Sequence, residues 1–96
     1  MPAAFWIAHV TVHDAEAYGR YAALAGEAIA AHGGAFLARA TRHVTLEGTD
    51  RKRHVVARFP SLEAAVACYN SPAYQAALEH ARGAADRDLM VVEAAE

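Results

Sequence analysis

The chain has 96 residues, of which 55% are hydrophobic and 21% are charged. This length is the usual size of one domain, so we expect a single fold unit over residues 1–96, and the composition excludes a disordered or fibrous chain. The net charge of −2 combines both signs along the chain without a basic stripe, which excludes the usual electrostatic surface for nucleic acid.

Cys68 is the only cysteine. An intramolecular disulfide is therefore impossible, and a zinc site built on several thiolates is excluded. The first residues lack the basic and apolar regions of a signal peptide, and no apolar run reaches the length that spans a bilayer. We expect a cytoplasmic protein with neither a membrane nor a nucleic-acid partner.

The first third of the chain predicts a strand followed by a helix. Residues 5–12 (FWIAHVTV) are almost continuously apolar, with β-branched and aromatic members, as in a strand that is covered on both faces. Asp14 can cap a helix whose apolar side chains recur every three or four positions over residues 18–32. Gly33 and Gly34 then end this helix, because glycine adopts the left-handed conformation that helix ends need.

A hairpin is predicted next. Residues 35–40 and 43–47 are two extended pieces, which we interpret as one long strand with a bulge or bend at residues 41–42. Residues 48–50 (GTD) provide a turn, and residues 53–59 (RHVVARF) return as a third strand. The basic run at the start of this third strand is interpreted as a solvated turn instead of a phosphate site.

The last part of the chain predicts a broken helix and a final strand. Ser61 can cap a helix over residues 62–69. The sequence Asn-Ser-Pro at residues 70–72 interrupts it, because proline restricts the residue before it and lacks an amide hydrogen. Ser71 caps a second helical segment that has Pro72 at its first position and runs to residue 81. Residues 89–94 (LMVVEA) form the last apolar strand.

This order of strand, helix, strand, strand, broken helix and strand is the βαββαβ arrangement of ferredoxin-like α+β domains. A four-stranded antiparallel sheet then carries both helical layers on one face, since crossover connections are right-handed. The first, third and fourth strands have apolar residues on both sides, so the helix-free face is also apolar. We expect a second copy of the chain to cover it, which makes the protein a homodimer.

Several short motifs together resemble one bacterial family. They lie in this order along the chain: WIAHV at 6–10, the tyrosines Tyr18 and Tyr21, the stretch from Gly33-Gly34 to Arg39, LEG at 46–48, FPS at 59–61 and SPAYQ at 71–75. The order and spacing resemble the domain of unknown function 1330 family, a branch of the dimeric α/β-barrel superfamily, over nearly the whole chain. One difference is that Ala40 and Thr41 follow Arg39 where similar sequences have two glycines.

The resemblance implies a dimeric α/β barrel but no particular reaction, because the family has no established general activity. Superfamily relatives include cofactor-free monooxygenases, lactone isomerases and haem-handling proteins, which share a cleft between the sheet and the helices. The six histidines show no paired spacing of the kind that binds metals. We therefore expect neither a cofactor nor a metal, and no catalytic residue is assigned.

Polar residues within apolar strands are the first candidates for a ligand site. His9 is either a general base or ligand contact in the cleft, or a core histidine bound to a neighbour. Arg39 and Arg58 each need a ligand anion, solvent or a carboxylate such as Glu47 or Glu93. We expect any ligand between the helices and the sheet, with His9 and Arg39 as the polar members of the site, which requires His9 to face the helices.

Tyrosines on the helices are the second group of candidates. Their hydroxyls either line the polar end of an aromatic pocket, or their rings only pack the helices on the sheet. The candidate ligand-binding residues are therefore His9, Tyr18, Arg39, Tyr69 and Tyr74. Two functions remain open: the cleft binds or transforms a small, partly apolar or anionic molecule, or the chain is a non-catalytic ligand-binding or structural homodimer.

Overall fold

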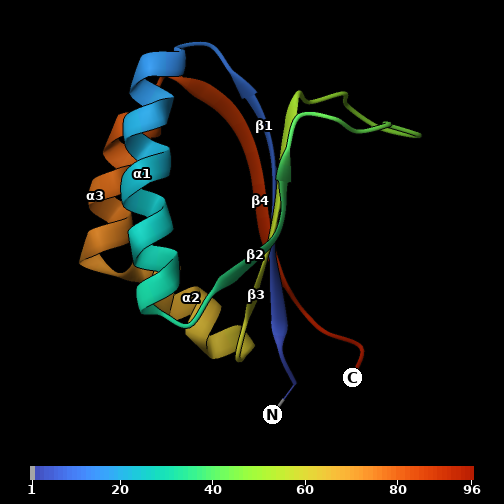
Figure 1. Ribbon diagram of the computed structural model, residues 1–96, viewed down its shortest axis with the longest axis vertical. Coiled ribbons are helices and arrows are strands. Elements are labelled where there is room, and N and C mark those ends of the chain that lie inside the picture. Colours follow the sequence, from blue (N-terminus) through green and yellow to red (C-terminus); the bar gives the residue numbers. More distant parts are fainter. Residues whose placement is uncertain (1) are drawn as a thin grey trace.

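The computed structural model describes residues 2–96. Its elements are, in chain order, β1 (Ala4–Val12), α1 (Ala15–Ala31), β2 (Ala35–Ala40), β3 (Arg53–Phe59), α2 (Leu62–Asn70), α3 (Pro72–Ala81) and β4 (Ala85–Glu93). The four strands form one antiparallel sheet in the order β2-β3-β1-β4, and the three helices cover the same face of it (Figure 1). The predicted ferredoxin-like α+β fold is confirmed.

Helix α1 begins and ends as its sequence predicts. Asp14 is the N-cap, and its side chain accepts a hydrogen bond of 3.1 Å from an amide of the first turn. At the other end Gly33 has a φ of +82°, and the amide of Gly34 donates to the carbonyl of Ile29 at 2.8 Å. A Cβ on Gly34 would come within 2.8 Å of the Phe59 ring. Glycine is therefore required there for close packing as well.

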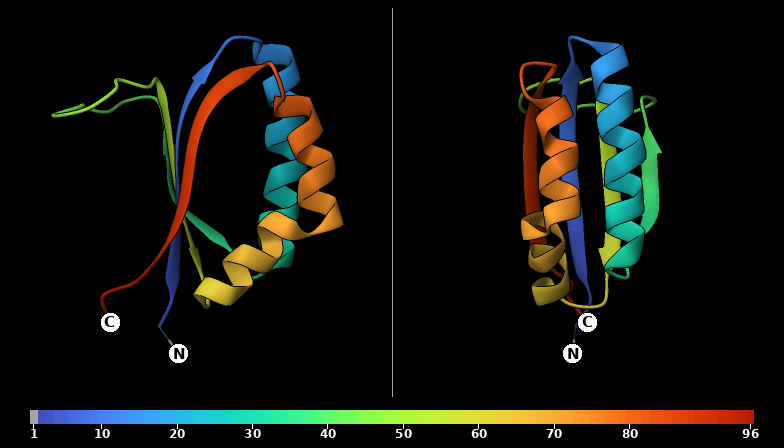
Figure 2. Two further views of the ribbon diagram at one scale, coloured as in Figure 1. Left: turned by 180° about the vertical axis from the view of Figure 1, so that it is seen from behind. Right: turned by 90° about the vertical axis from the view of Figure 1, so that its left-hand side faces the viewer.

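The second crossover is divided into two helices, as predicted. The hydroxyl of Ser71 donates to the carbonyl of Cys68 at 2.7 Å and accepts a hydrogen bond of 3.2 Å from the amide of Tyr74. Pro72 follows in the first turn of α3, where no amide hydrogen is needed. The break lets the two helices take different directions, and α3 runs alongside α1 over the sheet (Figure 2).

Strand β2 is shorter than predicted. It ends at Ala40, so the expectation of one long strand through residues 43–47 is wrong. Its irregularity lies between Phe36 and Ala38 instead of at residues 41–42. The residues that follow, 41–52, leave the sheet as a long loop (Figures 1 and 2).

Polar side chains within this β2–β3 loop explain the difference. Asp50 accepts a hydrogen bond from the Thr45 hydroxyl at 2.7 Å, and its carboxylate lies 2.9 Å from Nε2 of His43. Nδ1 of His43 lies 2.6 Å from the carbonyl of Thr41. Hydrogen bonds of this kind, from side chains to nearby groups of the loop, stabilise the loop conformation and compete with strand pairing to β3.

The helix-facing side of the sheet forms the core. On β1, every second residue from Ala4 to Val10 points toward the helices and is buried. Trp6 is 1% exposed, and its ring centroid lies 5.1 Å from that of Tyr74 and 5.7 Å from that of Phe59. This aromatic cluster holds the sheet against α2 and α3.

The opposite side of the sheet has no helix over it (Figure 2). The alternating residues of three strands place apolar side chains there, all of them at least partly exposed: Phe5, Ile7, Val56, Met90 and Val92. We call this surface the helix-free face. Strand β4 contributes to it over a greater length than predicted, because it begins at Ala85 and pairs with β1 from end to end.

Candidate functional site

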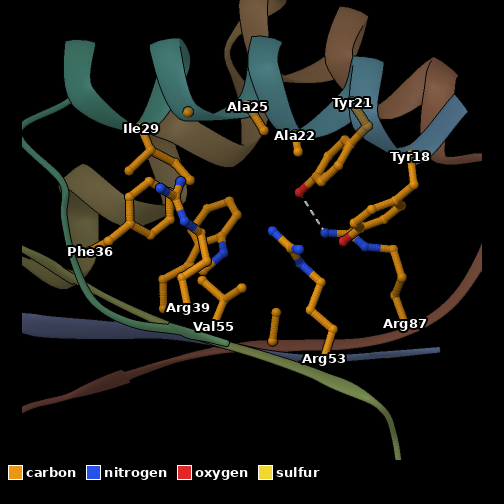
Figure 3. A pocket seen from close by; sticks show the side chains of 13 residues that line it. Tyr18, Tyr21, Ala22, Ala25, Ile29, Phe36, Arg39, Arg53, Val55 and Arg87 are labelled. Carbon is orange, nitrogen blue, oxygen red and sulfur yellow. Dashed lines mark hydrogen bonds between the residues drawn. The ribbon is translucent and has the colours of Figure 1, made fainter. Parts of the chain in front are cut away.

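A cavity lies between α1 and the helix-facing side of the sheet (Figure 3). Its walls come from α1 and from all four strands: Trp6, Ala8, Tyr18, Tyr21, Ala22, Ala25, Gly26, Ile29, Phe36, Arg39, Arg53, Val55 and Arg87. The volume open to the centre of a water molecule is about 30 Å³, which is room for about two water molecules. A larger ligand therefore requires the long arginine side chains in the lining to move.

The two ends of the cavity differ in chemistry. Ile29 and Phe36 lie at one end, and Tyr18, Tyr21 and Arg87 lie at the other, with the Arg53 guanidinium between them (Figure 3). Ile29 and Phe36 make the first end mainly apolar, but the Arg39 guanidinium lies over the Phe36 ring there. The other end is polar and basic. Such a combination fits a molecule with an apolar body and a charged head.

Strand register places two of the arginines at the same level of the sheet. Val10 of β1 pairs with Arg53 of β3 on one side and with Arg87 of β4 on the other. Directly paired residues share a face, and Val10 is fully buried beneath the helices, so both arginines point toward α1. Arg39 joins them from β2, where it pairs with Val55.

These three arginines have no acidic partner in the described part of the chain, residues 2–96. Each guanidinium lies near an aromatic ring instead: Arg39 is 4.3 Å from the Phe36 centroid, Arg53 5.9 Å from that of Tyr18, and Arg87 4.6 Å from that of Tyr21. The Nε atoms of Arg53 and Arg87 are buried and lack a hydrogen-bond partner within the same residues. Uncompensated cations of this kind attract an anion.

A hydrogen-bond network supports the basic end. The hydroxyl oxygens of Tyr21 and Tyr74 lie 2.6 Å apart, and Nη2 of Arg87 donates to Tyr21 at 2.6 Å and to Tyr74 at 3.1 Å. Burial is the main reason why the pKa of Tyr21 lies above its ordinary value, and burial likewise raises the pKa of Tyr74. Both hydroxyls are therefore protonated at neutral pH. The network can bind an anion and stabilise negative charge, but it offers no general base.

Three of the predicted site residues lie at or beside this cavity. Tyr18 and Arg39 line it. Tyr74 is fully buried behind it and reaches it through Tyr21. Tyr69 lies elsewhere: it is 37% exposed and lines a separate hollow between α2 and β4.

His9 is not among the residues that the structure brings together there. It lies on the helix-free face, so the expectation that it faces the helices is wrong. Alternation is the reason, because the buried Trp6 and Ala8 fix the even-numbered residues of β1 on the other side. Nδ1 of His9 instead lies 2.7 Å from Nδ1 of His54. A ligand contact by His9 stays a prediction for that face only.

Sequence reasoning missed Arg53 and Arg87, and it considered Tyr21 with the other helix tyrosines but did not select it as a site residue. Arg53 belongs to a basic run that was interpreted as a solvated turn, and Arg87 precedes the predicted last strand. One available signal was the alternation of Arg87 with Leu89 and Val91, which continues the buried face of β4 backwards. Arg58, which sequence reasoning did consider, lies on the exposed side and pairs with Glu96 at 3.3 Å.

Solved structures share this fold over nearly the whole chain. A crystal structure of a protein of unknown function from Rhodopseudomonas palustris has a TM-score of 0.80 at 23% identity, with 99% of this chain and 84% of that chain covered. A cofactor-independent oxygenase from Streptomyces nogalater, SnoaB, has a TM-score of 0.69 at 15% identity over 100% and 96% of the two chains. A dimeric ferredoxin-like protein of unknown function from Thermobifida fusca has a TM-score of 0.64 at 19% identity over 97% and 92%.

No curated protein sequence matches the chain. Within residues 2–96, none of the helices has both the length and the apolar character that crossing a membrane requires. The profile of a family described as "Domain of unknown function (DUF1330)" matches residues 3–95. The chain therefore belongs to the domain of unknown function 1330 family.

Proposed function

We propose that this protein is a homodimer that binds a small, partly apolar anion in the cavity between α1 and the sheet. The observation that carries the proposal is the group of three cavity arginines without an acidic partner in residues 2–96. Arg53 and Arg87 are partly buried, whereas Arg39 is exposed. Partial removal of a guanidinium from water without a counter-charge is costly, and a ligand anion offsets that cost at Arg53 and Arg87. The apolar side chains of Ile29 and Phe36, beside Arg39, fit the uncharged part of the same ligand.

Transformation of the ligand is the second part of the proposal. SnoaB, whose fold is similar, is a cofactor-independent oxygenase. In this chain the cavity supplies neutral hydroxyls and cationic guanidinium groups, which stabilise negative charge on a bound molecule. A reaction that passes through an anion of the ligand fits these groups, whereas a reaction that needs a protein base in the cavity does not. The alternative is a protein that binds the anion without turnover.

The homodimer is proposed from the helix-free face. Its apolar side chains are at least partly exposed, including Met90 at 56% and Val92 at 42%. Exposed apolar patches that span several strands are typical of interfaces. The similar protein from Thermobifida fusca is dimeric, which supports the same assembly here. A cytoplasmic location is part of the proposal as well.

The proposed ligand class is tested by isothermal titration with benzoate and with benzamide, which has the same shape without the charge. We expect benzoate to bind at least tenfold more tightly, and Arg53→Gln to remove most of this preference, because hydrogen bonds to charged groups contribute about 1.5–3 kcal/mol. Arg58→Gln, on the exposed side, is the matched control and should retain the preference. Equal binding of the two compounds would contradict the proposal.

A further inference from the structure

The fully buried hydroxyl of Tyr74 has a restricted choice of partners. Within residues 2–96, its oxygen has two hydrogen-bonding neighbours, Tyr21 Oη at 2.6 Å and Arg87 Nη2 at 3.1 Å. A guanidinium only donates, so Tyr21 is the one neighbour that can accept the Tyr74 proton. A buried hydroxyl that fails to donate loses a hydrogen bond it had with water. Tyr74 therefore donates to Tyr21.

This direction leaves the proton of Tyr21 unused. Tyr21 already accepts from Tyr74 and from Arg87, so both of its acceptor positions are occupied. Its own proton has to point elsewhere, and the Tyr21 side chain lines the cavity (Figure 3). Two accepted bonds also polarise the hydroxyl and strengthen it as a donor.

Arg87 is limited in a related way. Both hydrogens of its Nη2 are donated to the two tyrosines. A bidentate hydrogen bond to a carboxylate uses Nη2 together with either Nε or Nη1. Arg87 can therefore donate single hydrogen bonds to a ligand but cannot bind a carboxylate in the bidentate mode. Its Nε and that of Arg53 are buried donors without a partner in the described residues 2–96. Three unused donors therefore gather at the basic end of the cavity.

We propose that the Tyr21 hydroxyl donates a hydrogen bond to a single-oxygen anion of the ligand, a phenolate or an enolate, which Arg53 and Arg87 surround. This inference rests on the proposed function and specifies its ligand class. A phenolate has one charged oxygen and an apolar ring, which match the donor set and the end lined by Ile29 and Phe36. The charged and titratable groups that face Tyr21 are Tyr18, Arg53, Tyr74 and Arg87, with Arg39 at the far end. None of them is a carboxylate.

The probe is 4-nitrophenol, whose phenolate form absorbs visible light. Titration of the probe with saturating protein is expected to show the phenolate bound about tenfold more tightly than the phenol, which lowers the apparent pKa of the bound probe by about one unit. Tyr21→Phe should remove most of this preference. It should change binding of the neutral 4-nitroanisole less than twofold, and melting curves verify that the variant is folded. Tyr69→Phe, outside the cavity, is the matched control.

Tyr74→Phe tests the direction of the proton. If Tyr74 donates to Tyr21, this variant weakens phenolate binding, because Tyr21 loses a bond that polarises it. Stronger binding in Tyr74→Phe would show that Tyr21 normally donates to Tyr74, and it would overturn the inference. A phenolate preference that depends on Arg53 but survives Tyr21→Phe would also overturn it while leaving the proposed function intact. A protein that prefers neither phenolate nor benzoate would overturn both.

Discussion

The two sides of the sheet differ in whether their basic side chains have acidic partners. On and around the helix-free face, basic side chains have acidic partners: Arg51 pairs with Asp88 at 3.1 Å, and Arg58 pairs with Glu96 at 3.3 Å. On the helix-facing side, Arg39, Arg53 and Arg87 have none within residues 2–96. Solvent-exposed ion pairs cost little and contribute little. An unpaired cation that is partly buried, as Arg53 and Arg87 are, carries a desolvation cost. The side that tolerates this cost is the one on which we place the ligand.

Removing the aromatic centre of the helix-facing side should have the largest effect on stability. Trp6→Ala is expected to lower the free energy of unfolding by about 3–5 kcal/mol, because a fully buried aromatic ring leaves a cavity behind. Urea denaturation followed by circular dichroism measures this loss. Val44→Ala is the control, since Val44 is 82% exposed on the β2–β3 loop and its truncation should change the free energy by less than about 0.5 kcal/mol. A loss below about 1 kcal/mol for Trp6→Ala would show that Trp6 is not central to the core.

A charge placed on the helix-free face should separate the two copies. Ile7→Asp puts a carboxylate at the middle of the proposed interface, where burial of an unpaired charge is unfavourable. We expect multi-angle light scattering to report a dimer for the wild type and a monomer for this variant at micromolar concentration. Leu24→Asp, at an exposed position of α1, should remain dimeric. A dimeric Ile7→Asp would move the interface to another surface.

The paired charges of the β2–β3 loop should produce a smaller, pH-dependent effect. A hydrogen bond to Asp50 is the main cause that raises the pKa of His43 above its ordinary value, and the carbonyl of Thr41 adds to it. A raised histidine pKa stabilises the fold below the ordinary value of about 6.5, and this contribution is lost as pH rises through the pKa of the folded state. NMR titration should show that Asp50→Asn lowers the pKa of His43, whereas Glu63→Gln on α2 leaves it in place. No change in Asp50→Asn would show that the loop pair does not form in solution.

Most of the fold was predictable because its signals are local. Asp14, Ser61 and Ser71 are helix caps, as predicted. Pro72 separates α2 from α3 at the predicted position. The β2–β3 loop was mispredicted because its alternating apolar residues imitate a strand. The polar partners that hold it, such as Asp50, lie several residues away from the groups they bind.

The site was less predictable because both faces of β1 are apolar. With Phe5 and Ile7 on one side and Trp6 and Ala8 on the other, the hydrophobic pattern does not say which set faces the helices. His9 was therefore assigned to the wrong side. Arg53 and Arg87 come close together only because both pair with Val10. This pairing joins residues far apart in the sequence, so local patterns do not predict it.

The most direct test of the account is a crystal structure with 4-bromobenzoate, in which the anomalous signal of bromine locates the ligand. We predict a bromine peak beside Ile29 and Phe36, with the carboxylate directed toward Arg53 and the arginine side chains shifted to admit it. A peak on the helix-free face, or an empty cavity at ligand concentrations that saturate the protein in solution, would contradict the claim that the unpaired arginines mark the binding site.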